Sequence, residues 1–361
     1  MLQFLLTAAN VNAWGIEGHA IVGSIAQSFL NPNAISYVNQ ILSANNGDMS
    51  AVASWADTFK FTSAGAFSKP LHFVDIQDSP PTSCGFDEVR DCTNAACINT
   101  AIQTYTDQLC DSTQNLDALK FLIHFFGDIT QPLHNSYRDV GGNSDRVTYN
   151  GASTNLHHIW DSQMVIDRIS ANTDQATYVQ SLVNRIQSGD YASVASSWIS
   201  SQPYNAKSQY GNNLASIEYS KDSDKFDCSY VWKNYDADPS ADLSGAYYNG
   251  AASIIDLQLA KGGYRLANQL NAAFDGCAGV TPQPPVVGPT PTDAPPVTTV
   301  PAPTQTPVST CAHDKCVVGV RLARGCDPCV DQIIDDDAYC GRTRWAKTCV
   351  ARVASVCGLT C

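Results

Sequence analysis

The sequence predicts an all-α fold, a single helical domain with one small β-hairpin, followed by a small disulfide-rich module at the C-terminus. Apolar residues recur at helical spacing through most of residues 14–277. This zone shows neither strand–helix–strand alternation nor a glycine-rich phosphate loop. Eight of the fourteen Cys fall within residues 311–361, which is typical of a module held together by disulfides.

Composition divides the chain into four zones. Residues 1–13 read as a signal peptide that ends in Val-Asn-Ala, although no Lys or Arg precedes its apolar stretch, so that the leader is short or truncated. Residues 14–277 form the main domain. Residues 278–310 hold ten of the eighteen Pro and predict an extended Pro/Thr-rich linker before the Cys-rich module at 311–361. The leader and the cysteines predict a secreted protein, with the vacuole as a further destination.

The charge balance excludes one class of binding. The net charge is −13 and only 15% of residues are charged, so the chain lacks the Lys- and Arg-rich face of an electrostatic nucleic-acid binder. A phosphate substrate would need another source of positive charge, and bound metal ions can supply it locally. No run of 18 apolar residues occurs, so no transmembrane helix is predicted.

Helices are predicted along the first half of the main domain. Residues 32–42 carry apolar side chains at spacings of three and four, with a Pro in the first turn. Residues 48–57 begin with an Asp that can cap a helix. Residues 115–126 form a strongly apolar segment that opens with an Asn and ends before Pro132.

The second half continues the pattern. Residues 146–149 alternate before an Asn150-Gly151 pair, which predicts a hairpin turn. A capping Asn opens the helix predicted over residues 155–169. Residues 173–189 and 243–274 complete the helical set.

Histidines and aspartates stand at metal-ligand spacings. His124 with Asp128, and His157 with Asp161, are four residues apart, which on a helix places both side chains on one face. His134 lies just beyond the end of the first of these helices. Ligand sets of His and carboxylate suit zinc in a hydrolase.

The residue after the leader adds an unusual candidate ligand. Cleavage after Ala13 would expose Trp14 with a free α-amine, and His19 follows five residues later. An amine, its own carbonyl oxygen and an imidazole can together bind a metal ion. Taken singly, such a His is normally a hydrogen-bonded core residue, a His–Asp pair can be a surface pair, and a Trp is normally core. Together they favour a metal site.

Six segments carry a family resemblance. WGIEGH, SWAD, LHFVD, HFFGDITQPLH, VGGN and NLHHIWD resemble the zinc-dependent single-strand nucleases of the S1/P1 type, in that family's order, over about residues 14–277. The resemblance implies the all-α fold shared with the related phospholipase C enzymes. It also implies three zinc ions, cleavage of single-stranded DNA and RNA to 5′-phosphate products, and 3′-nucleotidase activity.

The resemblance also assigns the metal ligands residue by residue. Nine residues would bind three zinc ions, namely Asp57, His72, His124 and Asp128 for the first, Asp128, His19 and the amine and carbonyl of Trp14 for the second, and His134, His157 and Asp161 for the third. His158 competes with His157, but only His157 keeps the four-residue step to Asp161.

Five further positions match the family less firmly. Asp75 would orient the attacking water, and Lys60 would contact the phosphate. Phe73 and Val140 would sandwich a base, and Asn143 would hydrogen-bond to it. Each of four positions has a competing interpretation. Asp75 could be a capping residue, Lys60 a solvated surface residue, Phe73 a core residue and Asn143 a turn residue.

The resemblance further implies disulfides Cys84–Cys228 and Cys92–Cys97, which leaves Cys110 and Cys277 as a third pair. The eight Cys of the terminal module allow 105 connectivities, among which the sequence does not choose. Its ligand is not predicted, and for Trp345 and Tyr339 packing is favoured over binding.

Two other functions stay open. A zinc-dependent phospholipase C also begins with a Trp, but its first His lies much further from that Trp and its pattern ends in Glu, so the step from Trp14 to His19 and the presence of Asp161 favour the nuclease. A catalytically inactive secreted binding protein would belong to another class. The presence of all nine ligands argues against it.

Overall fold

The computed structural model describes residues 14–92, 96–277, 311–320, 322, 326–336, 340, 344–345 and 347–357. The chain divides into two compact units, Met1–Val287 and Gly288–Cys361. The predicted leader at 1–13 and linker at 278–310 lie outside the described residues.

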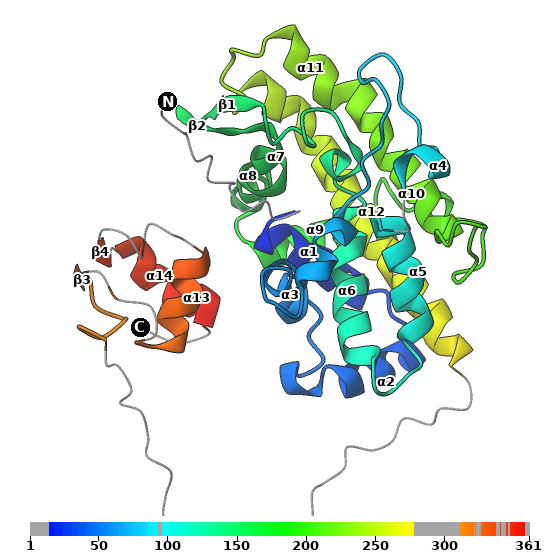
Figure 1. The fold of residues 1–361 in the computed structure, drawn as a ribbon, viewed down its shortest axis with the longest axis horizontal. Coiled ribbons are helices and arrows are strands. Elements are labelled where there is room, and N and C mark those ends of the chain that lie inside the picture. The colour runs from blue at the N-terminus through cyan, green and yellow to red at the C-terminus, as the bar shows by residue number, and fades with distance from the viewer. Residues whose placement is uncertain are drawn as a thin grey trace, which may run out of the picture. The chain divides into compact units, whose positions relative to one another are not determined.

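The first unit is helical, which confirms the predicted fold class (Figure 1). Its α-helices are α1 (Ile16–Gln27), α2 (Pro32–Ile41), α3 (Trp55–Phe59), α4 (Glu88–Asp91), α5 (Ile98–Gln108), α6 (Asn115–Asp128), α7 (Leu156–His158), α8 (Met164–Ala171), α9 (Gln175–Gln187), α10 (Leu214–Phe226), α11 (Trp232–Ala237) and α12 (Ala246–Gly276). Short 3₁₀ turns span Ser43–Asn45, Ser50–Val52, Ala66–His72, Pro132–Asn135 and Ala195–Trp198, and single π-turns span Ile159–Gln163 and Asp227–Val231.

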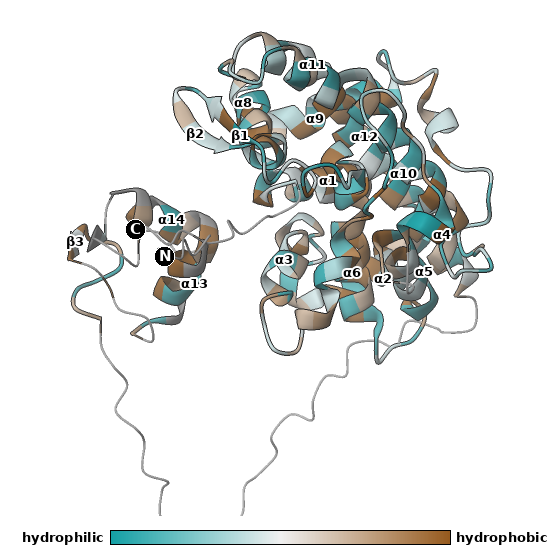
Figure 2. Cartoon of the chain, turned by 45° about the horizontal axis from the view of Figure 1, so that its top comes forward, coloured by the Kyte–Doolittle hydropathy of each residue, from teal (hydrophilic) through white to brown (hydrophobic). Residues whose placement is uncertain are grey.

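The core of this unit forms around α1, which packs against α6, α9 and the long helix α12. A Cβ atom at Gly263 of α12 would lie 2.5 Å from the side chain of Ile25, so the glycine allows α12 to approach α1 closely. Figure 2 shows the apolar residues of these helices mixed with polar ones along their lengths. Among the described residues, no helix combines the length and the apolar character needed to cross a membrane.

The predicted hairpin is present beside α7 and α8 (Figure 1). Strands β1 (Arg146–Tyr149) and β2 (Ala152–Asn155) pair antiparallel, with Tyr149 opposite Ala152. Asn150 and Gly151 between them both have positive φ, 51° and 73°. This conformation is the one that an Asn-Gly hairpin turn adopts.

The prediction of one continuous helix from Asp48 to Asp57 is wrong, because the segment contains a 3₁₀ turn and a separate short helix. The Asp48 carboxylate accepts hydrogen bonds from the backbone N–H groups of Ser50 and Ala51, at 2.8 and 3.4 Å. It therefore caps only the 3₁₀ turn that starts at Ser50, and α3 begins separately at Trp55. At the other predicted helix starts the segments agree to within a few residues.

Disulfides join distant parts of the first unit. The bonded pairs are Cys84–Cys228, Cys92–Cys97 and Cys110–Cys277. The first of these attaches the segment after the 3₁₀ turn Ala66–His72 to the π-turn Asp227–Val231.

The second unit has its own small core. It contains β3 (Gly319–Val320), α13 (Pro328–Asp336), β4 (Arg344–Trp345) and α14 (Lys347–Cys357), with disulfides Cys311–Cys326, Cys329–Cys357 and Cys340–Cys349. Trp345 is completely buried, and its indole N–H donates to the Lys315 carbonyl at 2.7 Å. Trp345 therefore packs, as favoured above, whereas Tyr339 lies outside the described residues.

Candidate metal centre

Five of the predicted ligands meet in one buried cluster, which we call cluster A. Its members come from α1, α3, the 3₁₀ turn before Phe73, and α6, and they are His19, Asp57, His72, His124 and Asp128. None of them is more than 3% exposed.

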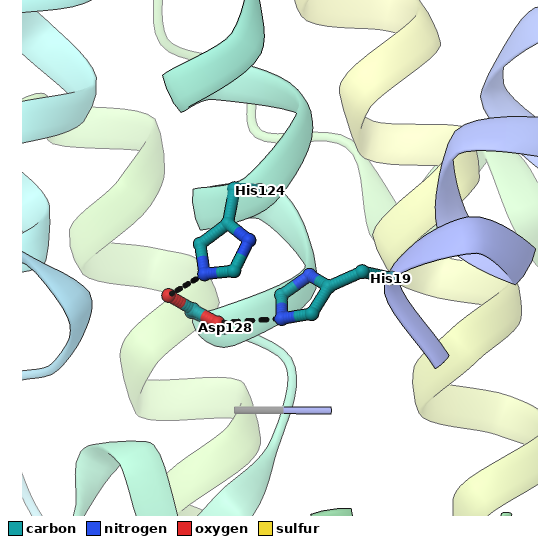
Figure 3. A group of neighbouring side chains, drawn as sticks. All are labelled: His19, His124 and Asp128. Carbon is teal, nitrogen blue, oxygen red and sulfur yellow. Dashed lines mark ion pairs between the residues drawn. The ribbon is translucent and has the colours of Figure 1, made fainter. Parts of the chain in front are cut away.

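Asp128 lies at the centre of cluster A. One of its oxygens lies 3.0 Å from Nδ1 of His72 and 3.3 Å from Nε2 of His124, and the other lies 3.2 Å from Nε2 of His19. Figure 3 shows His19 and His124 approaching the carboxylate from α1 and α6. Because its two oxygens face different imidazoles, Asp128 is placed as a bridging ligand would be.

Asp57 closes cluster A on the side of α3. Its Oδ1 lies 3.5 Å from Nε2 of His124 and 3.8 Å from Nδ1 of His72, while the Lys60 ammonium donates to the same oxygen at 2.7 Å. Lys60 therefore already has one carboxylate partner in cluster A.

The remaining predicted ligands form cluster B, which consists of His134, His157 and Asp161. The Nε2 atoms of the two imidazoles lie 3.1 Å apart, and Asp161 lies 3.1 Å from Nε2 of His157. Asp161 belongs to the π-turn Ile159–Gln163, and such turns are frequent at functional sites. His158 is exposed and takes no part in the cluster.

Backbone carbonyls fix the orientation of the imidazoles. Nδ1 of His124 lies 2.8 Å from the Ala53 oxygen, and Nδ1 of His134 lies 2.9 Å from the His72 oxygen. Nδ1 of His157 lies 2.6 Å from the oxygen of Gly141. A ring that donates through Nδ1 presents the lone pair of its Nε2, which is how outer partners position metal-binding histidines.

The donor atoms fit a metal ion. With both Nδ1 atoms donating, the Nε2 lone pairs of His134 and His157 face each other, which is unfavourable unless a proton or a metal ion lies between them. Several buried atoms also lack a hydrogen-bond partner, among them Nε2 of His72 and oxygens of Asp57, Asp128 and Asp161. His and carboxylate donors in this combination suit zinc.

Burial and charge set the protonation of the imidazoles. Burial lowers the pKa of His72 to about 4, although its hydrogen bond to Asp128 opposes the shift. Burial also lowers the pKa of His19 and of His134. For His124, burial is outweighed by the carboxylates of Asp128 and Asp57, which raise the pKa to about 10. For His157 as well, burial is outweighed by the Asp161 carboxylate, which raises the pKa. The lowered pKa values of His19, His72 and His134 favour the neutral imidazole, the form that binds metals.

Trp14 lies beside cluster B. Its side chain is completely buried, and the indole N–H donates to Oγ1 of Thr130 at 3.3 Å. The next residue, Gly15, donates its N–H to the Asp161 carbonyl at 2.6 Å. The predicted cleavage after Ala13 lies outside the described residues.

A pocket of about 230 Å³ opens onto both clusters. Its lining contains all five of the other predicted site residues and several that the sequence did not indicate. It is formed by Lys60, Lys69, His72, Phe73, Asp75, Leu133, His134, Ser136, Val140, Gly141, Asn143 and His157. The only sequence signal for Lys69 is that it is the second Lys, after Lys60, in the segment before His72.

The turn that carries Val140 has an unusual backbone. Val140 has a positive φ of 58° and is 68% exposed, a conformation that costs a β-branched residue about 1–3 kcal/mol. The amide N–H of Asn143 donates to the Val140 carbonyl at 2.8 Å, which is a turn role, while its Oδ1 has no partner. Asp75 also lines the pocket, and burial together with the nearby Asp91 raises its pKa.

Buried His and Asp clusters that open onto one pocket define a candidate metal-dependent hydrolase. A family model described as S1/P1 nuclease matches residues 14–275, and the chain belongs to this family. It is 42% identical to Nuclease S1 of Aspergillus oryzae over 265 residues, covering 72% of this chain and 91% of that protein.

Two other relatives cover a similar share of the chain. Identity is 38% to Nuclease P1 of Penicillium citrinum over 271 residues (72% of this chain, 97% of that protein). It is 32% to Endonuclease 4 of Arabidopsis thaliana over 277 residues (72% and 89%). This chain is therefore a nuclease, a phosphodiester-cleaving enzyme. Residues 309–361 match a separate domain family of unknown function.

Proposed function

We propose that residues 14–277 bind three zinc ions and hydrolyse single-stranded DNA and RNA to 5′-phosphate products, with 3′-nucleotidase activity, in a secreted enzyme. The observation that supports this most is that His72 of cluster A and His134 and His157 of cluster B line one pocket. A phosphate in that pocket would meet both clusters at once.

The ligands are those expected from the resemblance. Cluster A together with Trp14 would hold two zinc ions that share Asp128, and cluster B would hold the third. When bound, zinc lowers the pKa of a water molecule and offsets the charge of the phosphate oxygens. These ions would also supply the positive charge that a chain of net charge −13 otherwise lacks.

The protein groups of the pocket would position the substrate. Asp75 would orient the attacking water through its carboxylate, and the Lys60 ammonium would offset charge on the phosphoryl group. Phe73 and Val140 both line the pocket, and Phe73 is 36% exposed. The two side chains would hold one unpaired base between them. The free Oδ1 of Asn143 would accept a hydrogen bond from that base.

The test compares zinc content with hydrolysis of matched oligonucleotides. We expect about three zinc ions per chain and much faster cleavage of a single strand than of the same sequence as a duplex. Phe73→Ala should reduce that preference through a higher KM, while Tyr210→Ala, another exposed aromatic outside the pocket, should not. Equal rates on single strand and duplex would contradict the proposal.

The same protein tests the alternatives. Hydrolysis of phosphatidylcholine at a rate comparable to that of DNA would favour the phospholipase C function. Zinc-loaded protein without any hydrolytic activity would favour the inactive binding protein.

A further inference from the structure

Lys69 is the second ammonium group that lines the pocket, and its surroundings differ from those of Lys60. The Lys60 side chain is buried and already donates to Asp57 at 2.7 Å. Lys69 is exposed, and among the described residues no carboxylate lies within ion-pair distance of its ammonium. The positive charge of Lys69 is therefore available to a bound anion.

The backbone places Lys69 on the same side as a candidate metal ligand. Lys69 and His72 both belong to the 3₁₀ turn Ala66–His72. A 3₁₀ helix has three residues per turn and rises about 2 Å per residue, so Lys69 stands on the face of His72 and about 6 Å before it. The buried Ser68 anchors the turn, because its hydroxyl and its backbone N–H both donate to the Gly65 carbonyl, at 2.8 and 2.9 Å.

Phe61 supports the Lys69 side chain. The Lys69 ammonium lies 5.5 Å from the centroid of the Phe61 ring, and the Lys60 ammonium lies 5.7 Å from the same centroid. An aromatic face attracts a cation, so the ring limits the positions that the long Lys69 side chain adopts. Two ammonium groups near one ring repel each other, and an anion bound near both would offset that repulsion.

We propose that Lys69 binds the phosphate next to the one that is cleaved, and so favours a nucleic-acid strand over a substrate with a single phosphate. This inference rests on the proposed function, in which the cleaved phosphate lies in the pocket at clusters A and B. A strand carries one phosphate per nucleotide, and Lys69 stands one helical turn from His72, which lines the same pocket. Two nucleosides joined by one phosphate offer no second phosphate to Lys69.

The experiment compares two substrates of the full, zinc-loaded chain, a single-stranded oligonucleotide and a dinucleoside monophosphate, whose only phosphate is the one that is cleaved. Lys69→Ala should raise KM for the oligonucleotide at least about fivefold more than KM for the dinucleoside monophosphate, because only the longer substrate loses a charged contact. Lys69→Arg keeps the charge and should restore most of the difference.

The salt dependence provides a second measurement on the same proteins. Loss of one phosphate contact to a single strand should make the slope of log(kcat/KM) against log[KCl] shallower by about 0.7. Lys207→Ala removes an exposed Lys outside the pocket and should change neither KM nor this slope. Phe61→Leu keeps an apolar side chain without the aromatic face and should raise KM for the oligonucleotide about two- to fivefold.

Binding without cleavage separates this inference from the proposed function. A fluorescent single-stranded oligonucleotide with charged, non-hydrolysable phosphonate linkages reports the Kd by anisotropy. If the natural protein cleaves neither substrate, the proposed function fails, while weaker and less salt-dependent binding by Lys69→Ala would still support the role of Lys69. The inference is wrong if Lys69→Ala affects both substrates equally, or if it behaves as Lys207→Ala does in KM, Kd and salt dependence.

Discussion

Gly127 and His19 are in contact where α6 passes α1. A Cβ atom at Gly127 would lie 2.6 Å from Nδ1 of His19 and 3.0 Å from the neighbouring ring carbon. Because the imidazole is completely buried, it has no room to withdraw. The absence of a side chain at Gly127 therefore sets the position of a candidate zinc ligand next to Asp128.

Gly127→Ala should separate folding from metal binding. Alanine favours the helix by roughly 0.5–1 kcal/mol, so the fold should persist, while the displaced His19 should cost one zinc ion and lower kcat at least about tenfold. Zinc counting and circular dichroism on the same sample check this. Gly85→Ala, where a Cβ would meet nothing within 4 Å, should keep full zinc content.

The adjacent histidines of α7 provide a second test. His157→Ala should remove one zinc ion and most of the activity, because His157 shares cluster B with His134 and Asp161. His158→Ala changes the exposed neighbour of His157 and should leave the zinc content and the activity unchanged. The variant keeps the backbone N–H of residue 158, which donates to the Asn155 side chain. The same losses in both variants would show a general disturbance of α7 rather than the loss of a ligand.

Spacing within one helix was enough to predict two close His–Asp pairs. His124 with Asp128 and His157 with Asp161 lie as the four-residue step requires, even though a π-turn begins inside the second pair. The spacing could not predict how α1 brings His19 to Asp128, nor that Lys69 lines the pocket, because both depend on tertiary packing.

Several helices were not predicted, namely α1, α4, α5, α10 and α11. For α10 there is a physical reason, because its buried face includes Ser216, Ser220 and Ser223 and is largely polar. On α5, Asn99 donates to the hydroxyl groups of Ser216 and Ser220 on α10, at 3.1 and 3.0 Å. A network of this kind satisfies the buried groups of both helices, and the periodicity of apolar residues does not reveal it.

The ion pairs between α10 and α12 should make the stability of the fold depend on pH. Asp222 accepts from Lys261 at 2.6 Å and from Arg265 at 2.7 Å. Burial raises the pKa of Asp222, but Arg265 and Lys261 outweigh burial, so the pKa in the folded state is lowered. A carboxylate of this kind stabilises the fold above its unfolded pKa of about 3.9, and the stabilisation is lost as the pH falls below that value.

Asp222→Asn should therefore lower the free energy of unfolding by about 2–3 kcal/mol at pH 7, since it leaves two buried cations without their partner. The difference from the natural protein should stay constant down to about pH 5 and shrink below about pH 4. Urea unfolding at a series of pH values measures it, with Glu218→Gln as the exposed control on the same helix. A difference that does not change with pH would contradict the assignment.

The terminal module should be dispensable for hydrolysis. All candidate ligands lie before residue 162, and the two units have separate cores. A chain that ends at Gly279 keeps Cys277 and its bond to Cys110, and should cleave small nucleotides normally. A loss beyond about tenfold, roughly 1.4 kcal/mol of transition-state stabilisation, would show that the module takes part.

The last prediction concerns the start of the mature chain. The position of Trp14 is fixed by its buried indole and by the hydrogen bond from the Gly15 N–H to the Asp161 carbonyl. In an uncleaved chain the backbone nitrogen of Trp14 belongs to a planar amide and has no lone pair for a metal. As a free amine its unperturbed pKa is about 7.7–8.0, and zinc competes with protons for it.

Protein that begins at Trp14 should therefore bind one more zinc ion than protein with a single additional Gly before it, and should be far more active. Acetylation of the Trp14 amine should have the same effect as the additional residue, because it removes the lone pair and adds little bulk. The zinc held by this amine should also be the first to be lost as the pH is lowered. Zinc content and activity of the three refolded forms provide the measurement, and equal values in all three would refute the role of Trp14.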